Sequence, residues 1–229
     1  MSDVQPVDGG EGIGGRMRAD ERREQLIHVA IQVFSKKGFN GATTKEIARA
    51  AGVTEALIFR HFPSKEALYE AILRWKVERS GLEEKWSELR LRAERRDDSG
   101  VFRLVASSLL DFHRENVDFL RLMFYAILED HQLADTFRER QVVPIYEFLT
   151  EYVSLRQREG AFAAEVDPGA AVRAIIGVPF YHSLVSNLFR CNILQIADEE
   201  AVDTFIHIAL DGLRRRPEAI HNEILKDEK

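Results

Sequence analysis

Residues 43–68 read Thr-Thr-Lys-Glu-Ile-Ala-Arg-Ala-Ala-Gly-Val-Thr-Glu-Ala-Leu-Ile-Phe-Arg-His-Phe-Pro-Ser-Lys-Glu-Ala-Leu. This pattern predicts two short helices joined by a tight turn, followed by the start of a third helix. Ala48 is small enough for a crossing helix to pack against it, and Gly52 tolerates a positive φ at the turn. Val53 and Ile58 supply apolar contacts between the two helices. The spacing is typical of a helix-turn-helix, whose second helix enters the major groove of DNA.

The expected helix starts agree with this interpretation. Thr43 and Glu46 have the spacing of a capping box, although Thr44 is an alternative cap for the same helix. Thr54 is expected to cap the next helix, over residues 55–62, and Ser64 the one after it. Because independent start signals coincide with the turn, the joint pattern is more specific than the Ala-Gly spacing alone.

The rest of the chain also predicts helices. The first is expected from Asp20 to Lys37, and the fourth from Ser64 to about Gly81, or brokenly on toward Arg96. A charged segment, 92–98, is expected to join two helical sets. Further helices are expected over 99–115, 117–129, 132–158, 168–190 and 198–215, with Pro144 kinking or splitting the third of these.

The predicted fold is therefore all-α, with an N-terminal three-helix DNA-binding domain of the helix-turn-helix kind and a C-terminal helical bundle. The fourth helix is expected to be the only element continuous with both parts. The expected organisation is a disordered tail over 1–18, the helix-turn-helix domain over 19–66, the helical domain over 67–216 and a C-terminal tail over 217–229.

Composition bounds the function of the chain. Its 229 residues carry a net charge of -6, but residues 16–75 have a balance of +4 and the remainder -10. A basic segment on an acidic chain suits local contact with phosphates. The single cysteine, Cys191, excludes an intrachain disulfide and a cysteine zinc cluster. No metal or cofactor is expected. With no apolar leader or membrane span in the sequence, we expect a soluble cytoplasmic protein.

The segment over about residues 20–75 resembles the TetR family of bacterial transcriptional regulators, almost position for position from Thr43 to Thr54 and from Leu57 to Leu68. The resemblance implies a homodimer that binds a palindromic operator, represses transcription and leaves DNA when a small molecule enters the C-terminal domain. One departure is Phe59, where the family often has tyrosine; the ring is retained, but the hydroxyl contact to phosphate is lost.

The expected DNA-binding residues lie on the two helices of the motif and at the start of the fourth. Glu55 suits cytosine recognition but also suits the positive end of its helix, and His61 meets either phosphate or only Phe62. The set is Thr43, Thr44, Lys45, Thr54, Glu55, Ala56, Leu57, Phe59, Arg60, His61 and Lys65.

Lys45 and Lys65 both fall in the first turn of a helix, where the helix dipole disfavours a cation by roughly 0.3–1 kcal/mol. A DNA phosphate at each helix start would reverse this effect, because amides and lysine would share one anion. Both lysines are therefore expected to contact the DNA backbone; the alternative is that they are solvated and have no role.

The helical domain is expected to hold a small hydrophobic or aromatic effector. Ten of the 14 phenylalanines lie between Phe102 and Phe205, and most of them are expected to be core. The residues expected to line an apolar pocket are Phe102, Phe112, His113, Met123, Phe124, Tyr146, Tyr152 and Phe180.

Two apolar stripes on the last long helices are expected to form a four-helix dimer interface with a second copy. Alternatively, they close the core of the monomer. The stripes consist of Val172, Ile175, Ile176, Leu184 and Leu188, and of Val202, Phe205, Ile206, Ala209 and Leu213.

Two rival classes of function remain open. An enzyme is disfavoured because zinc-protease, phosphate-loop and nucleophile-elbow motifs are missing, and the one Glu-x-x-His pair, Glu218 and His221, lies in the C-terminal tail. A helical carrier or sensor of hydrophobic molecules that does not bind an operator is the second rival.

Overall fold

The computed structural model describes residues 19–79, 81–189, 191 and 195–214. Within these ranges the regular secondary structure is helical, and the β-type pairing is one isolated bridge between Phe162 and Arg214. The expected tails over 1–18 and 217–229 lie outside the described residues. None of the described helices has the length and apolar content needed to cross a bilayer.

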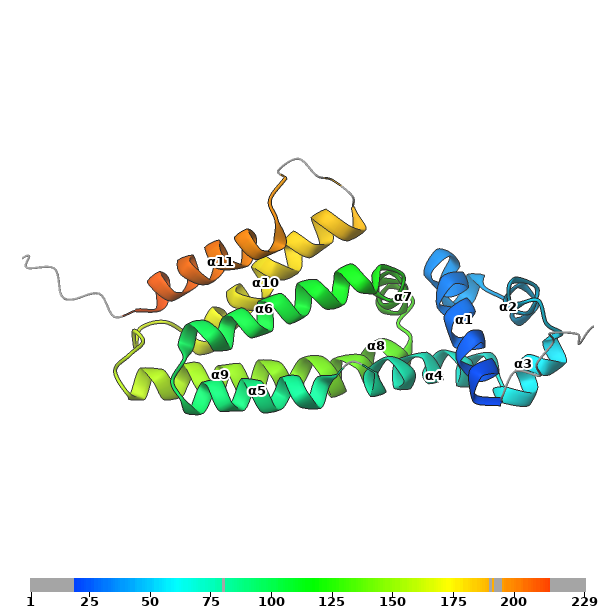
Figure 1. The fold of residues 1–229 in the computed structure, drawn as a ribbon, viewed down its shortest axis with the longest axis horizontal. Helices are drawn as coiled ribbons and strands as arrows, with labels where there is room; N and C mark the ends of the chain where they lie inside the picture. The colour runs from blue at the N-terminus through cyan, green and yellow to red at the C-terminus, as the bar shows by residue number, and fades with distance from the viewer. Residues whose placement is uncertain (1–18, 80, 190, 192–194, 215–229) are drawn as a thin grey trace, which may run out of the picture.

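The N-terminal helices are α1 (Ala19–Gly41), α2 (Thr44–Ala51), α3 (Glu55–His61) and α4 (Lys65–Glu78). They gather at one end of an elongated molecule, with α4 leading toward the other helices (Figure 1). The helical geometry of α1 is interrupted at Gly38, where φ is 69° and ψ is -177°. The predicted end of the first helix at this glycine is thus confirmed as a kink.

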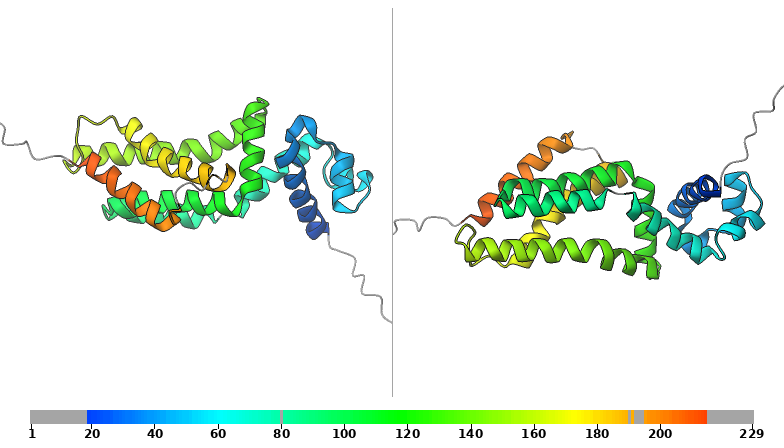
Figure 2. Two further views of the ribbon diagram at one scale, coloured as in Figure 1. Left: turned by 90° about the horizontal axis from the view of Figure 1, so that it is seen from above. Right: turned by 60° about the horizontal axis from the view of Figure 1, so that its bottom comes forward.

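The remaining helices run along the long axis of the molecule, apart from α7, which stands across it beside α1 (Figures 1 and 2). A break at 95–97 separates α5 from α6, inside the predicted joint at 92–98. The elements are α5 (Leu82–Glu94), α6 (Asp98–Glu115), α7 (Val117–Leu128), α8 (Gln132–Phe137), η1 (Arg138–Val142), α9 (Val143–Arg158), α10 (Pro168–Ser183), η2 (Leu184–Leu188) and α11 (Asp198–Leu213).

Two π-helical runs interrupt the long helices expected over 132–158 and 168–190. The run η1 ends just before Pro144, which removes a backbone donor and crowds the preceding turn, so the hydrogen bonds there shift to a longer spacing. Pro179 lies within α10, and η2 follows it. The predicted split at Pro144 is confirmed.

Two separate apolar cores form, and their division does not follow the expected domain boundary at residue 66. The first core contains buried residues of α1–α4 together with Phe119, Leu122, Met123 and Ala126 of α7 and Leu133 of α8. The second core joins α5, α6, α9, α10 and α11. The helix-turn-helix segment therefore completes its core with helices that lie much later in the chain.

The C-terminal end of α7 is hydrogen-bonded to the backbone of α1. The Glu129 carboxylate accepts hydrogen bonds from the backbone N–H groups of Phe39 at 2.9 Å and Asn40 at 3.4 Å. The Tyr125 hydroxyl donates to the carbonyl of Lys36 at 3.3 Å. Gly38 lies under both side chains, so a β-carbon there would overlap the Glu129 carboxylate. The two parts are therefore held together by contacts of α7 with α1, in addition to the expected continuity of the chain through α4.

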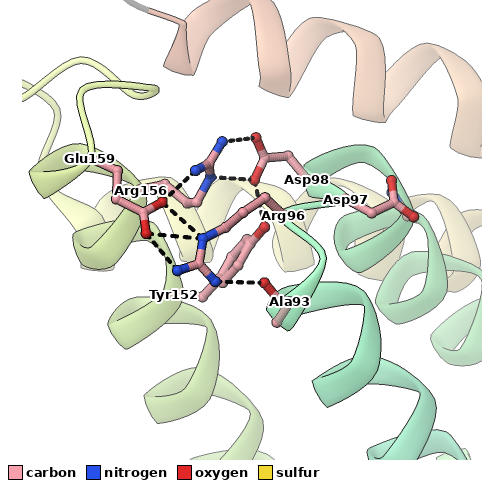
Figure 3. A network of polar contacts seen from close by, with 8 residues as sticks. Ala93, Arg96, Asp97, Asp98, Tyr152, Arg156 and Glu159 are labelled. Atoms are coloured by element: carbon pink, nitrogen blue, oxygen red, sulfur yellow. Dashed lines mark hydrogen bonds and ion pairs between the residues drawn. The ribbon is translucent and has the colours of Figure 1, made fainter.

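A polar network connects the beginning of α6 to the end of α9, at the end of the molecule away from the N-terminal helices (Figures 1 and 3). Asp98 accepts from the Arg156 guanidinium at 2.8 and 3.1 Å and from the Tyr152 hydroxyl at 2.5 Å. Glu159 accepts from Arg96 at 2.9 Å and also from Arg156. The bonds to Asp98 raise the pKa of Arg156, and burial raises the pKa of Tyr152.

A buried polar pair links α6 to α10. The His113 ring nitrogen Nδ1 lies 2.9 Å from the Ser183 hydroxyl, and both residues are buried. Burial lowers the pKa of His113 to about 4. The ring is therefore neutral near pH 7, and protonating it would place an unpaired charge in the interior.

The left-handed backbone at Gly38 generates a stability prediction. Replacing Gly38 by Ala should cost about 1–3 kcal/mol in backbone strain, with a further loss because the β-carbon displaces Glu129. Gly160→Ala is the matched control, since Gly160 also has a positive φ, of 77°, but nothing within 4 Å of the added atom. Urea unfolding should rank Gly38→Ala as clearly less stable; equal losses would contradict the contact.

The buried His113 generates a pH prediction. Its pKa is about 4 when folded and about 6.5 when unfolded, so the unfolded chain binds more protons between these values. The free energy of unfolding should therefore decrease as pH falls from about 6.5 to about 4, by as much as about 3 kcal/mol. Urea unfolding across this window should show a shallower decrease for His113→Gln. An identical pH dependence in both proteins would refute the assignment.

Candidate nucleic-acid interface

The turn between α2 and α3 is built around Gly52, whose φ of 67° and ψ of 33° are left-handed. Its N–H donates to the carbonyl oxygens of Ala48 and Arg49, and the Val53 N–H donates to Ala48 at 3.0 Å. These bonds satisfy the last carbonyls of α2 and reverse the chain. The turn predicted from the Ala48–Gly52 spacing is confirmed.

One edge of α3 is anchored and the opposite edge faces solvent. Ile58 is fully buried and Phe62 is 2% exposed, so they fix α3 to the core of the N-terminal helices. Ala56 and Arg60 are exposed, and Phe59 keeps 44% of its surface accessible. The exposed Phe59 ring therefore lies next to Arg60 on the edge of α3 that faces solvent.

The start of α2 has the predicted capping box. The Thr43 hydroxyl accepts from the Glu46 N–H at 3.2 Å, and the Glu46 carboxylate accepts from the Thr43 N–H at 3.2 Å. Thr43, rather than the alternative Thr44, is therefore the cap. Lys37 also pairs with Glu46 at 2.5 Å, and these two partners lower the pKa of the carboxyl group. Lys45 stays exposed in the same first turn, so the argument for a phosphate contact still applies to it.

The starts of α2 and α3 are tied together by a side-chain bond, which was not foreseen. The Thr44 hydroxyl donates to the Glu55 carboxylate, so the neighbouring helix supplies a third reason for an acid at Glu55. Thr54 occupies the N-cap position of α3, but its side chain makes no capping bond, and the residue is exposed. The expectation that Thr54 caps α3 through its hydroxyl is wrong, which leaves that hydroxyl available to a ligand.

Lys65 does not behave as the sequence argument assumed. Its ammonium group donates to the carbonyl oxygen of Ala42 at 2.9 Å and lies 4.1 Å from the centre of the Phe39 ring. These internal contacts explain a cation in the first turn of α4 without any phosphate. Lys65 thus ties the start of α4 to the chain before α2, and its place in the first turn no longer argues for a DNA contact, which stays a prediction.

A basic cluster beside α3 was missed in the sequence. Arg22 and Arg23 of α1 lie near Arg60 and His61, and the Arg23 guanidinium stacks 4.9 Å from the centre of the Phe62 ring. Burial, followed by the three arginine charges, lowers the pKa of His61. The adjacent pair Arg22-Arg23 near the start of the first predicted helix was the available signal. The cluster extends the positive surface from α3 onto α1.

The residues expected to line an apolar pocket are not brought together. Met123 belongs to the first core, whereas Phe102 and Tyr152 belong to the second, so these three fill separate interiors. Phe112, His113 and Phe180 do meet, with ring centres 6.1 and 5.4 Å apart. Tyr146 packs against the second core, and Phe124 is half-buried on α7. A single pocket formed by all eight residues is therefore wrong.

The residues expected at a dimer interface mostly close the monomer core, which was the alternative left open. The buried ones are Val172, Ile175, Ile176, Val202, Ile206 and Leu213, and the half-buried ones are Leu184, Leu188, Phe205 and Ala209. The outward faces of α10 and α11 instead expose Val178, Tyr181 and Ile208, at 46%, 66% and 64% of their surface. The described residues contain no group of three or more potential metal-ligating side chains.

Comparison with known proteins places this motif among regulators. Residues 26–72 match the family described as bacterial regulatory proteins, tetR family. The transcriptional activator FasR of Mycolicibacterium smegmatis is 43% identical over 70 residues, which cover 31% of this chain and 32% of FasR. Over this shared segment the chain thus spans about a third of that relative. The transcriptional repressor NicS of Pseudomonas putida is 26% identical over 207 residues, covering 86% of this chain and 95% of NicS.

The whole fold is also shared with solved structures. The crystal structure of AibR in complex with isovaleryl coenzyme A and operator DNA aligns with a TM-score of 0.60 at 19% identity, covering 82% of this chain and 97% of AibR. At this identity the likeness concerns the fold. The match over residues 26–72 and the curated relatives that share it identify this segment as one of the tetR family of bacterial regulatory proteins, and the all-α fold of the whole chain is shared with solved structures of such regulators.

Proposed function

We propose that this chain is a ligand-responsive transcriptional regulator that binds a palindromic DNA operator as a homodimer. Each subunit would insert the exposed edge of α3 into the major groove, and a small molecule bound to the helical body would change the affinity for DNA. The protein would act in the cytoplasm, where such an operator is accessible.

The observation that carries this proposal is the exposed edge of α3. Ala56 and Phe59 are suited to contact thymine methyl groups and sugars, and Arg60 is suited to guanine or phosphate. Thr43, Lys45 and Thr54 surround this edge with exposed donors for the DNA backbone. Glu55, bonded to Thr44, would position α3 rather than read bases alone.

The relatives support regulation but leave its direction open. FasR is an activator and NicS is a repressor, so both outcomes occur among similar proteins. AibR has been crystallised with both isovaleryl coenzyme A and operator DNA. We propose repression as the simpler outcome for a protein that covers its operator, and release by an effector as the response.

The proposed dimer would use the outward faces of α10 and α11. Val178, Tyr181 and Ile208 are large and exposed, and a second copy packed against them would bury this apolar surface. A dimer would also present two copies of α3 to half-sites about one helical turn apart, roughly 34–36 Å.

Lys45 and Lys65 give a test of DNA binding in which one lysine controls for the other. Fluorescence anisotropy with the DNA upstream of the protein's own gene should show binding that weakens steeply with salt. Lys45→Gln should reduce the slope of log K against log salt by about one unit per subunit. Lys65→Gln should leave this slope unchanged and instead lower the free energy of unfolding, because it loses the bond to Ala42.

These measurements also distinguish a protein that does not bind DNA from one in which only the proposed Lys45 contact is wrong. Absence of binding to this DNA and to every other duplex tested would refute the regulator and favour a carrier of small molecules. Binding with an unchanged slope in Lys45→Gln would refute only the backbone contact of that residue.

The proposed interface generates a prediction for the oligomeric state. Tyr181→Glu and Ile208→Glu should each shift the protein from dimer to monomer in sedimentation-velocity measurements, because a charge would be buried in an apolar interface. Leu128→Glu is the control, since Leu128 is 79% exposed but lies on α7. A wild-type monomer, or a dimer that persists in both α10 and α11 variants, would contradict this interface.

A further inference from the structure

A polar cleft of about 600 Å³ lies where the N-terminal helices meet the body of the molecule. It is bounded by α1, α4, the junction of α6 and α7, and η2. Its volume falls in the range of small-molecule sites. Its polar lining includes His28, Gln32, Lys76, Asn116, Arg121 and Asn187. None of the residues expected to line an apolar effector pocket borders it.

Lys76 is the unusual group in this cleft. It is half-buried, and its hydrogen bond among the described residues goes to the neutral side-chain oxygen of Asn116. Burial lowers the pKa of Lys76, and the charge of Glu115 opposes this only in part. Within the described chain no carboxylate forms a salt bridge with it. A partly desolvated cation without an anionic partner is unfavourable, so an anion that enters the cleft would be stabilised.

Two other groups make the same part of the cleft positive. The N-terminus of α7 opens into it, and Asn116 occupies the N-cap position without making a side-chain capping bond there. Its amide nitrogen instead donates to the Phe112 carbonyl at 2.8 Å. Uncapped N–H groups and the helix dipole favour an anion. Arg121 follows on the same helix and pairs only loosely with Asp118, at 3.9 Å.

Two carboxylates of the lining, Asp118 in the first turn of α7 and Glu115, offset part of this positive charge. Arg114 is already satisfied by Asp198 at 2.6 Å and Asp111 at 2.5 Å. Glu115 is exposed, and its charge is screened by solvent. His28 packs edge-on against the Trp75 ring, with centres 4.5 Å apart. Its pKa is lowered by burial and by Lys76, so the ring is neutral near pH 7 and adds no charge to the cleft.

An unsatisfied polar group lies on Trp75, the residue next to Lys76 in α4. The indole nitrogen of Trp75 is buried, and it has no hydrogen-bond partner among the described residues. Trp75 contacts the cleft-lining His28, and the Lys76 ammonium lies 5.0 Å from the centre of its ring. Buried polar groups are rarely left unpaired without a reason, and this unpaired donor lies directly beside Lys76 in α4.

We propose that this cleft binds the anionic group, a carboxylate or a phosphate, of the small molecule to which the regulator responds, with Lys76, Arg121 and the N-terminus of α7 as its contacts. The inference rests on the proposed function and assigns its effector a chemical class and a place. It differs from the apolar effector expected from the sequence, because the anionic group would lie between the N-terminal helices and the body.

The site is placed to affect the DNA-facing helices directly. α7 begins at the cleft. Glu129, which follows its last residue, accepts hydrogen bonds from the backbone N–H groups of Phe39 and Asn40. An anion drawn between Lys76 of α4 and the first turn of α7 would pull these helices together and change the angle of α1. The two copies of α3 would then no longer match their half-sites.

The test measures anion binding without DNA, using Trp75 as the reporter. The chain has two tryptophans, so Trp86→Phe leaves Trp75 alone beside Lys76. We would titrate this protein with sodium phosphate and with sodium hexanoate, keeping the ionic strength constant with sodium chloride. A saturable change in emission with at least one of them is expected, and the arm with the higher affinity separates a phosphate-bearing from a carboxylate-bearing ligand. A linear response to both would overturn the site.

Two variants decide whether Lys76 is the contact. Lys76→Met should weaken the anion affinity at least about tenfold, and in the absence of anion it should raise Tm by about 2–4 °C, because it removes a desolvated charge. Lys85→Met, which replaces a half-buried lysine of α5 outside the cleft, should change neither quantity. Unchanged affinity in Lys76→Met, or a lower Tm without anion, would show that the lysine is only structural and overturn the proposal.

The outcomes remain distinct from those for DNA binding. A protein that binds an anion through Lys76 but binds no duplex would contradict the proposed regulator and leave the site standing. A protein that binds its upstream DNA but neither anion would contradict the site alone.

Discussion

The contact between α1 and α7 is the constraint on which the arrangement of the molecule depends. α1 packs more extensively against α7 than against α2 or α4, and Glu129 satisfies the backbone just after the kink at Gly38. The segment that leads into α2 is therefore fixed by a helix of the body. Since the first core also includes Phe119 and Leu133, the helix-turn-helix and the body cannot move independently without exposing apolar surface.

Through this contact, a movement at the cleft can reach α1 along a single short helix, α7. α7 has 12 residues and is about 18 Å long, with the anion cleft at its first turn and the grip on α1 just past its last. The far end of the body is closed by Asp98, Tyr152 and Arg156 (Figure 3), which hold α6 against α9. A change at the cleft is therefore more readily passed to α1 than along the body, because one end of α6 is fixed by charged hydrogen bonds.

The sequence predicted those features that depend on neighbouring residues. The capping box at Thr43, the left-handed turn at Gly52 and the split before Pro144 each follow from backbone chemistry within a few positions, and each is found in the structure. The exposure of Phe59 was also implicit, because Ile58 and Phe62 fix the buried side of a helix with 3.6 residues per turn. The family resemblance rested on these same local features.

Features that depend on distant pairings could not be read from the sequence. Lys65 bonds to a carbonyl 23 positions away, and Phe39 bonds to Glu129, 90 positions away. The spacing of apolar residues along the sequence does not identify either partner. Met123 and Phe102 have similar sequence environments but fill different cores. The expected pocket therefore joined residues that the fold separates, while the cleft at Lys76 is assembled from five helical elements and has no sequence signature.

The central claim is that the exposed edge of α3 lies against DNA, and photocrosslinking tests it most directly. A benzophenone side chain would be placed at Ala56, on that edge, and in a second protein at Ile127, which is 58% exposed on α7. We predict that ultraviolet light crosslinks the Ala56 protein, and not the Ile127 protein, to the DNA upstream of its own gene. Bound duplex that crosslinks through Ile127 but never through Ala56 would contradict the account.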